Sequence, residues 1–169
     1  MVLDQNNYAF IDGQNLNLGI QTLGWKLDYK KFRVYLAEKY SVTNAYIFLG
    51  YIKKNNALYE GLKRSGYIPI FRQISYASNR NVKGNVDAEM LLHTMIKLPT
   101  FDKAVIVSGD GDFFCLVEYL IGNSKLSRIL IPNQNRYSSL YKNISTSITH
   151  VADFLGYYKN KLEYKAKSS

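Results

Sequence analysis

The chain has 169 residues, 47% hydrophobic and 21% charged, a composition typical of one globular domain with its own core. Its 22 lysines and arginines outnumber 13 acidic residues, and the net charge of +9 favours a polyanionic partner such as nucleic acid. The single cysteine, Cys115, excludes an intramolecular disulfide and a cysteine-rich zinc site, and its apolar neighbours predict a buried thiol. No apolar run approaches the ~18 residues of a membrane span, and the polar start predicts no signal peptide, so we expect a cytoplasmic protein with no membrane partner.

Short apolar runs predict strands, and several are apolar at consecutive positions, as in parallel strands covered on both faces. In chain order they are Tyr8–Asp12, Val42–Gly50, Gly66–Phe71, Lys103–Ser108 and Ser127–Pro132, with Ser147–Ala152 as a further candidate. Helix signals separate them over Asp28–Lys39, Asn55–Ser65, Val86–Lys97 and Asp112–Ile121. This alternation predicts right-handed βαβ units and a doubly wound α/β sheet. We expect one domain over residues 1–155 and a basic C-terminal tail over residues 156–169.

Four aspartates fall where such a fold would gather them. Asp12 ends the first strand, and Asp110 and Asp112 follow the fourth. Asp87 lies in the first turn of the helix predicted from Val86, whose N-terminus should lie at the same edge of the sheet. Because ligands of open α/β sheets bind at the carboxyl ends of the strands, we expect the four carboxylates to converge there.

Each aspartate also has a structural interpretation. Asp12 could serve a turn because a glycine follows it. Asp112 could be an N-cap, and Asp87 could interact favourably with its helix dipole. Asp110 is the hardest to explain structurally, since it follows a buried strand and precedes a second acid.

Converging carboxylates suggest a metal site, because they repel one another and raise each other's pKa unless a cation neutralises them. Oxygen ligands without a His or Cys cluster favour Mg²⁺ or Mn²⁺. Such an ion polarises a phosphoryl oxygen and lowers the pKa of a bound water that attacks phosphorus. Asn15 either anchors the loop after the first strand or hydrogen-bonds within this site. The predicted catalytic and metal-binding residues are Asp12, Asp87, Asp110 and Asp112.

Basic and aromatic residues that could contact nucleic acid lie in two parts of the sequence. Near the segment that leads to Asp87 they are Arg72, Arg80 and Lys83, and beyond the fifth strand they are Arg136, Tyr137 and Tyr141. The first group could equally be solvated loop charges. The second combines charge with rings that stack on bases, which is a weak signal for single-strand binding.

The motifs FIDGQNL, KGNVDAEM and VSGDGDF, in this order and spacing, resemble the NYN domain, a LabA-like branch of the PIN-like nuclease superfamily. The resemblance runs from Tyr8 to Ala152. It implies a Rossmann-like, PIN-type three-layer α/β/α sandwich with a mainly parallel sheet of five or six strands. It also implies dependence on Mg²⁺ or Mn²⁺ and endonuclease activity, usually on RNA. The family's acidic positions match the four aspartates, Asn15 and Ser108 match supporting positions, and Gln14 stands where relatives often have Glu or Ser.

We therefore expect a metal-dependent phosphodiesterase acting on RNA. The main alternative is a non-catalytic RNA-binding or assembly module on the same fold, which would bind the backbone with salt dependence but without cleavage. A phosphatase of the haloacid dehalogenase type would need its Asp-x-Asp pair after the first strand, and a dinucleotide-binding enzyme would need G-x-G-x-x-G there, so both are disfavoured. A homodimer remains open.

Overall fold

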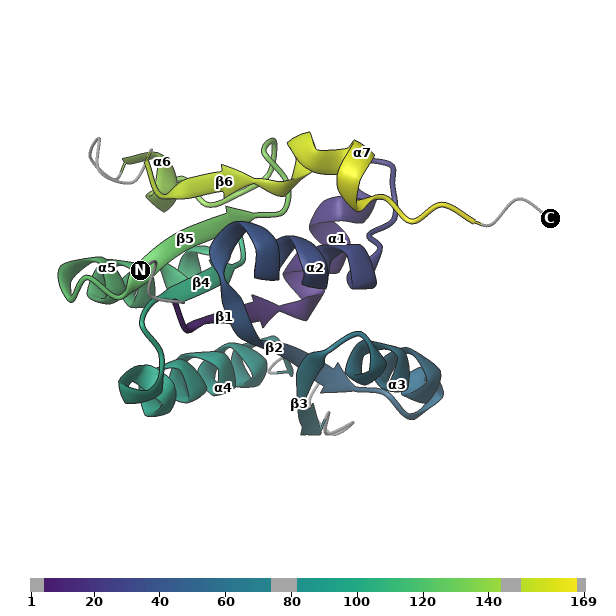
Figure 1. The fold of residues 1–169 in the computed structure, drawn as a ribbon, viewed down its shortest axis with the longest axis horizontal. Helices are drawn as coiled ribbons and strands as arrows, with labels where there is room; N and C mark the ends of the chain where they lie inside the picture. The colour runs from purple at the N-terminus through teal and green to yellow at the C-terminus, as the bar shows by residue number, and fades with distance from the viewer. Residues whose placement is uncertain (1–4, 74–81, 144–149, 167–169) are drawn as a thin grey trace.

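The computed structural model describes residues 5–73, 82–143 and 150–166, which form a three-layer α/β/α sandwich (Figure 1). At its centre is a six-stranded parallel sheet with the order β3-β2-β1-β4-β5-β6. The strands are β1 Asn7–Asp12, β2 Val42–Tyr51, β3 Tyr67–Gln73, β4 Ala104–Val107, β5 Leu126–Ile131 and β6 Ala152–Phe154. The predicted fold class is confirmed.

Helices cover both faces of this sheet (Figure 1). The α-helices are α1 Gly13–Gln21, α2 Tyr29–Tyr40, α3 Asn56–Arg64, α4 Val82–Lys97, α5 Phe114–Gly122, α6 Leu140–Asn143 and α7 Lys159–Leu162. The 3₁₀ turns are η1 Lys53–Asn55, η2 Leu98–Thr100, η3 Gly111–Phe113 and η4 Leu155–Tyr158. Among the described helices, none combines the length and apolar composition that a membrane span requires.

The core is divided into two clusters by the sheet. Ile11 of β1 belongs to the cluster that contains Leu16 of α1 and Phe32 of α2. Its neighbour Phe10 belongs to the other cluster, with Met90 of α4. All five side chains are buried. Because successive strand residues point to opposite faces and both faces are covered, the inner strands are apolar at consecutive positions.

Helix α4 begins at Val82, not at Val86 as predicted. Asp87 therefore lies beyond the first turn, so the structural interpretation that it interacts with the N-terminal end of the helix dipole is wrong. Gly84 and Asn85 have low helix propensity, which makes a later start plausible from sequence, but tertiary context overrides propensity here. The buried Met90 shows that this helix packs on the sheet.

Helix α1 was not predicted, although Asp12 caps it and Leu16 and Ile20 share its buried face. The sixth strand lies later than predicted, at Ala152–Phe154, and residues 147–149 of the predicted run lie outside the described residues. The prediction of a buried Cys115 is wrong, because α5 turns Leu116, Val117 and Leu120 to the core and exposes the cysteine.

The C-terminal segment continues into η4 and α7 and packs against α2. Leu162 of α7 is buried in the same cluster as Phe32 of α2. Leu27 and Glu163 form an isolated antiparallel bridge, and Lys31 Nζ donates to the Glu163 carbonyl at 2.9 Å. The domain boundary at residue 155 stays a prediction.

Candidate functional site

Strands β1 and β4 are neighbours at the point where the chain reverses its progress across the sheet. From β1 the chain runs outward to β2 and β3, and then returns to β4 and continues to β5 and β6. Asp12 ends β1 and Ser108 follows β4, so both lie at the carboxyl edge of adjacent strands. Open α/β sheets bind their ligands at such a switch point.

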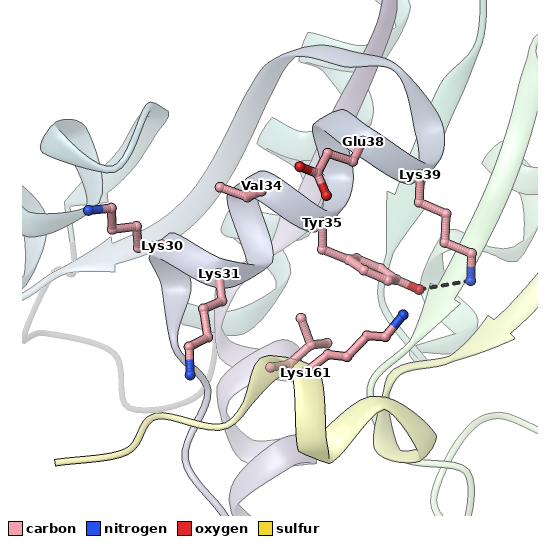
Figure 2. A pocket seen from close by; sticks show the side chains of 8 residues that line it. Lys30, Lys31, Val34, Tyr35, Glu38, Lys39 and Lys161 are labelled. Carbon is pink, nitrogen blue, oxygen red and sulfur yellow. Dashed lines mark hydrogen bonds between the residues drawn. The ribbon is translucent and has the colours of Figure 1, made fainter. Parts of the chain in front are cut away.

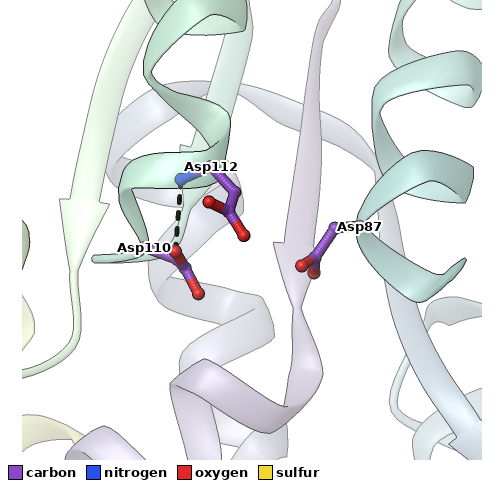
Figure 3. Close-up of side chains that lie close together, drawn as sticks. All are labelled: Asp87, Asp110 and Asp112. Carbon is purple, nitrogen blue, oxygen red and sulfur yellow. Dashed lines mark hydrogen bonds between the residues drawn. The ribbon is translucent and has the colours of Figure 1, made fainter. Parts of the chain in front are cut away.

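Three aspartates meet at this edge and form what we call the acidic trio. Asp87, Asp110 and Asp112 each offer a carboxylate oxygen, and these oxygens all lie within 4.8 Å of one another. Figure 3 shows Asp87 reaching from α4 toward the two aspartates that follow β4. Asp87 is buried, Asp110 is half-buried and Asp112 is exposed, so the trio is walled by protein on one side and open to solvent on the other. Such a set of hard oxygen donors suits a divalent cation.

Asp12 is linked to the trio through Ser108, although the 4.8 Å group found among the described residues does not include it. The buried Ser108 hydroxyl donates to Asp12 Oδ2 at 3.1 Å and accepts from the Asp110 backbone N–H at 3.1 Å. Asp12 Oδ1 accepts from the Asn15 N–H at 3.0 Å and caps α1. One buried carboxylate therefore connects the start of α1 with the turn that carries Asp110.

Asn15 ties the same two segments together from the other side. Its Oδ1 accepts from the backbone N–H of Gly109 at 2.8 Å. This contact matches neither role weighed for Asn15 from the sequence, because its side chain anchors the turn after β4 and not the loop after β1. It supports a positioning role beside the acidic trio.

Asp110, and not Asp112, caps the turn that leads into α5. Asp110 has an extended backbone (φ −79°, ψ 131°), and its Oδ1 accepts from the Asp112 N–H at 3.2 Å (Figure 3). The capping role predicted for Asp112 is therefore wrong. Because η3 intervenes between β4 and α5, the cap moves two residues toward the strand. The Asp112 carboxylate is left exposed beside the other two.

Residues after β5 pack over this turn, where glycine permits their close approach. The Ser138 N–H donates to the Gly109 carbonyl at 2.9 Å, and the Tyr141 hydroxyl donates to the Asp110 carbonyl at 2.8 Å. A Cβ at Gly111 would lie 2.5 Å from Ser138 Oγ. The glycines of the S-G-D-G-D motif thus allow a second segment to hold its backbone.

Tyr141 is a buried support for this turn and does not present its ring to bases, so that suggestion from the sequence is wrong. It is 5% exposed. Burial raises the pKa of its hydroxyl well above the ordinary value, and the negative charge of Asp110 acts in the same direction. The hydroxyl therefore stays protonated and remains a hydrogen-bond donor. Sequence reasoning missed this role because Tyr141 is one of 15 tyrosines and the contact spans 31 residues.

The basic residues predicted to bind nucleic acid differ in their surroundings. Arg72 is half-exposed and forms an ion pair with Glu89 at 2.8 Å. Arg136 is exposed, and Tyr137 packs against Phe154 with ring centroids 5.5 Å apart. The remaining two predicted positions cannot be placed: Arg80 lies outside the described residues, as does the side chain of Lys83.

A lysine-rich hollow of about 570 Å³ lies away from these acids, between α2 and α7 (Figure 2). Lys30, Lys31, Lys39 and Lys161 line it. Its one lining carboxylate is Glu38, so it does not offer the grouped acids that a divalent cation requires. Among the described residues, the grouped carboxylates that could hold a divalent cation lie at the carboxyl edge of the sheet.

Comparison with known proteins agrees with this architecture. The chain is 28% identical over 121 residues to the low amplitude and bright protein LabA of Synechococcus elongatus. The aligned region covers 66% of this chain and 65% of LabA, slightly less than two thirds of that protein. A crystal structure of a protein of unknown function from Vibrio parahaemolyticus shares the fold, with a TM-score of 0.66 and 21% identity over 91% of this chain and 93% of that one. The family model of the NYN domain matches residues 8–151. The resemblance of the three motifs is thereby confirmed, and the chain belongs to the NYN domain family.

Proposed function

We propose that this NYN-domain protein is a metal-dependent endoribonuclease that hydrolyses RNA phosphodiester bonds. The observation that supports it most is the acidic trio, in which Asp87 of α4 and the two aspartates of the turn after β4 meet within 4.8 Å at the switch point of the sheet. The PIN-like nuclease fold of the family and the net charge of +9 agree with a nucleic-acid substrate. A cytoplasmic location and a homodimeric state remain predictions.

The donor set fits Mg²⁺ or Mn²⁺, which prefer carboxylate oxygens. Asp87, Asp110 and Asp112 would hold the ion, and Asp12, the fourth proposed metal-binding residue, would act from the end of β1. When bound, such an ion polarises a phosphoryl oxygen and lowers the pKa of the attacking water.

The protein's own part is to keep these carboxylates in place. Ser108 couples Asp12 to the backbone of Asp110, while Asn15 and Tyr141 hold the turn on either side. Such partners around a metal site fix the orientation of its ligands. The exposed carboxylate of Asp112 lies on the side from which a substrate phosphate would approach.

The experiment incubates the protein with labelled single-stranded RNA or DNA in Mn²⁺, Mg²⁺ or EDTA and compares Asp110→Asn with wild type. We expect metal-dependent cleavage of RNA that EDTA abolishes. Asp110→Asn should slow it at least about 100-fold, because loss of a ligand removes several kcal/mol of transition-state stabilisation.

Glu118→Gln is the matched control, since Glu118 is an exposed acid on α5 that does not belong to the acidic trio. It should cleave at the wild-type rate, and circular dichroism should show both variants folded. Cleavage by Asp110→Asn at the wild-type rate would refute the assignment. Salt-dependent RNA binding with no product in any metal would favour the non-catalytic binding module.

A further inference from the structure

Two hollows meet beside the acidic trio and share two lining residues, Asn15 and Arg136. The first, about 520 Å³, lies along α1 and reaches Asp12. The second, about 630 Å³, contains Asp110 and Asp112. Both volumes fall within the range of about 300–1,000 Å³ that is usual for ligand sites. We treat the two as one continuous groove, the α1 groove, which runs from α1 to the acidic trio.

Arg136 stands at the junction of the two hollows, on a turn clamped to α1. Asn133 Nδ2 donates to the Gly19 carbonyl at 3.2 Å and to Thr22 Oγ1 at 2.9 Å, while its Oδ1 accepts from the Asn135 N–H at 2.8 Å. The Arg136 N–H donates to the Asn133 carbonyl at 3.2 Å. The backbone of Arg136 is therefore fixed, while its side chain is exposed.

The guanidinium of Arg136 is available to an anionic ligand. It lines both hollows together with carboxylates, yet among the described residues it forms no ion pair. An arginine fork matches the geometry of a phosphate and binds it through two parallel hydrogen bonds. In contrast, Arg72 is already paired with Glu89.

We infer that the α1 groove binds a single-stranded nucleic acid, with one unpaired nucleoside in the hollow along α1 and an adjoining backbone phosphate on Arg136. The inference rests on the proposed phosphodiesterase function, because the next phosphate along the strand then reaches the acidic trio. Gln14 and Asn15 line the first hollow with side-chain amide groups. Such groups can hydrogen-bond the edges of an unpaired base, whereas a duplex keeps those edges engaged in pairs.

The first test measures binding of a short fluorescein-labelled single-stranded oligoribonucleotide by anisotropy, with Ca²⁺ replacing Mg²⁺. Arg136→Ala should weaken binding about tenfold. A plot of the logarithm of the association constant against the logarithm of the salt concentration should be less steep by about one unit, which is the effect of one lost phosphate contact. Arg64→Ala is the control, because exposed Arg64 ends α3 just before β3 begins, at the opposite edge of the sheet. It should bind within about twofold of wild type.

A second pair of variants tests the hollow along α1, because the two substituted side chains differ in charge and have nearly the same size. Leu18 is 50% exposed and lines the hollow along α1, so a polar residue there should not disturb the fold. Leu18→Glu should bind the oligonucleotide several-fold more weakly than Leu18→Gln, because only the former adds a negative charge to the hollow that receives the polyanionic strand. Equal binding by these two variants would overturn the placement of the strand.

The outcomes separate this inference from the proposed activity, because hydrolysis of bis(p-nitrophenyl) phosphate and of RNA is measured separately with Mn²⁺. If Arg136→Ala weakens binding and wild type hydrolyses nothing, the α1 groove stands and the nuclease proposal fails. If wild type cleaves RNA while Arg136→Ala binds like wild type, the groove is refuted and the nuclease proposal stands. Single-stranded DNA that binds with the same dependence on Arg136 also supports the groove, whereas duplex RNA that binds as tightly as the single strand overturns it.

Discussion

The hydroxyl of Tyr141 provides a direct test of how the turn that carries Asp110 is held. It donates to the Asp110 carbonyl at 2.8 Å, and its ring packs 5.9 Å from that of Phe114. Tyr141→Phe keeps the ring and removes only the donor. Leaving a buried acceptor unsatisfied costs about 1–3 kcal/mol, and we expect about 1 kcal/mol because the Asp110 carbonyl retains a longer bond of 3.4 Å from the Phe113 N–H.

Urea unfolding is the assay for this variant. The midpoint should fall at an unchanged m-value, and the Tm should fall by about 2–4 °C, as 1 kcal/mol does in a chain of this size. Tyr119→Phe is the control, because Tyr119 is 45% exposed and its ring carries the same hydroxyl into solvent. That variant should lie within about 0.5 kcal/mol of wild type.

The same substitution should also weaken Mn²⁺ binding about tenfold in calorimetry, because partners that orient metal ligands affect affinity by that much or more. Tyr119→Phe should bind Mn²⁺ like wild type. If Tyr141→Phe matched Tyr119→Phe in both stability and Mn²⁺ affinity, the hydrogen bond to Asp110 would have no supporting role and the reasoning would be refuted.

Three further predictions follow from the structure. Gly13→Ala should destabilise the fold by about 1–3 kcal/mol, because its Cβ would lie 2.9 Å from a backbone carbonyl oxygen of β2. Gly61→Ala meets nothing within 4 Å and should stabilise α3 by about 0.5–1 kcal/mol. Thermal unfolding of both variants checks this pair, and a Gly13→Ala variant more stable than wild type would contradict it. Burial alone would raise the pKa of Asp153, but hydrogen bonds led by that from Lys39 at 2.8 Å outweigh it and lower the pKa. The Asp153 carboxylate therefore stabilises the fold above the unfolded-state pKa of about 3.9, and this stability is lost as the pH falls through the lower folded pKa. In urea unfolding measured at a series of pH values, Asp153→Asn should lose less stability than wild type below about pH 4. The same loss of stability in both proteins over this range would contradict the prediction. Mn²⁺ at about 100 times its Kd should stabilise wild type by about 2.7 kcal/mol and leave Asp87→Asn nearly unaffected; an equal thermal shift in both would remove Asp87 from the ligand set.

Much of the fold follows from local patterns. The first five strands lie within about two residues of their predicted ends, because parallel strands buried on both faces appear as continuous apolar runs. Asp28 and Gly66 mark a helix start and a helix end as expected, since capping and a positive φ of 90° are local requirements. Asp12 and Asp110 could be placed at the carboxyl edge for a similar reason, because Asp12 ends the first strand and Asp110 lies in the short turn after the fourth.

The tertiary structure alone decided how the candidate site is assembled. That Asp87 meets Asp110, that Asp110 is the residue that caps η3, and that Tyr141 is buried against the same turn all depend on contacts between segments far apart in the chain or on an intervening 3₁₀ turn. The pairing of Arg72 with Glu89 is of the same kind. The sequence by itself determined the first five strands, helices α2, α3, α4 and α5 in outline, and the placement of Asp12 and Asp110 at the carboxyl edge, because apolar runs and caps are local signals. Only the tertiary structure decided where α1, the start of α4 and β6 lie and which side chains meet at that edge, because periodicity along one segment carries no information about its partners in space.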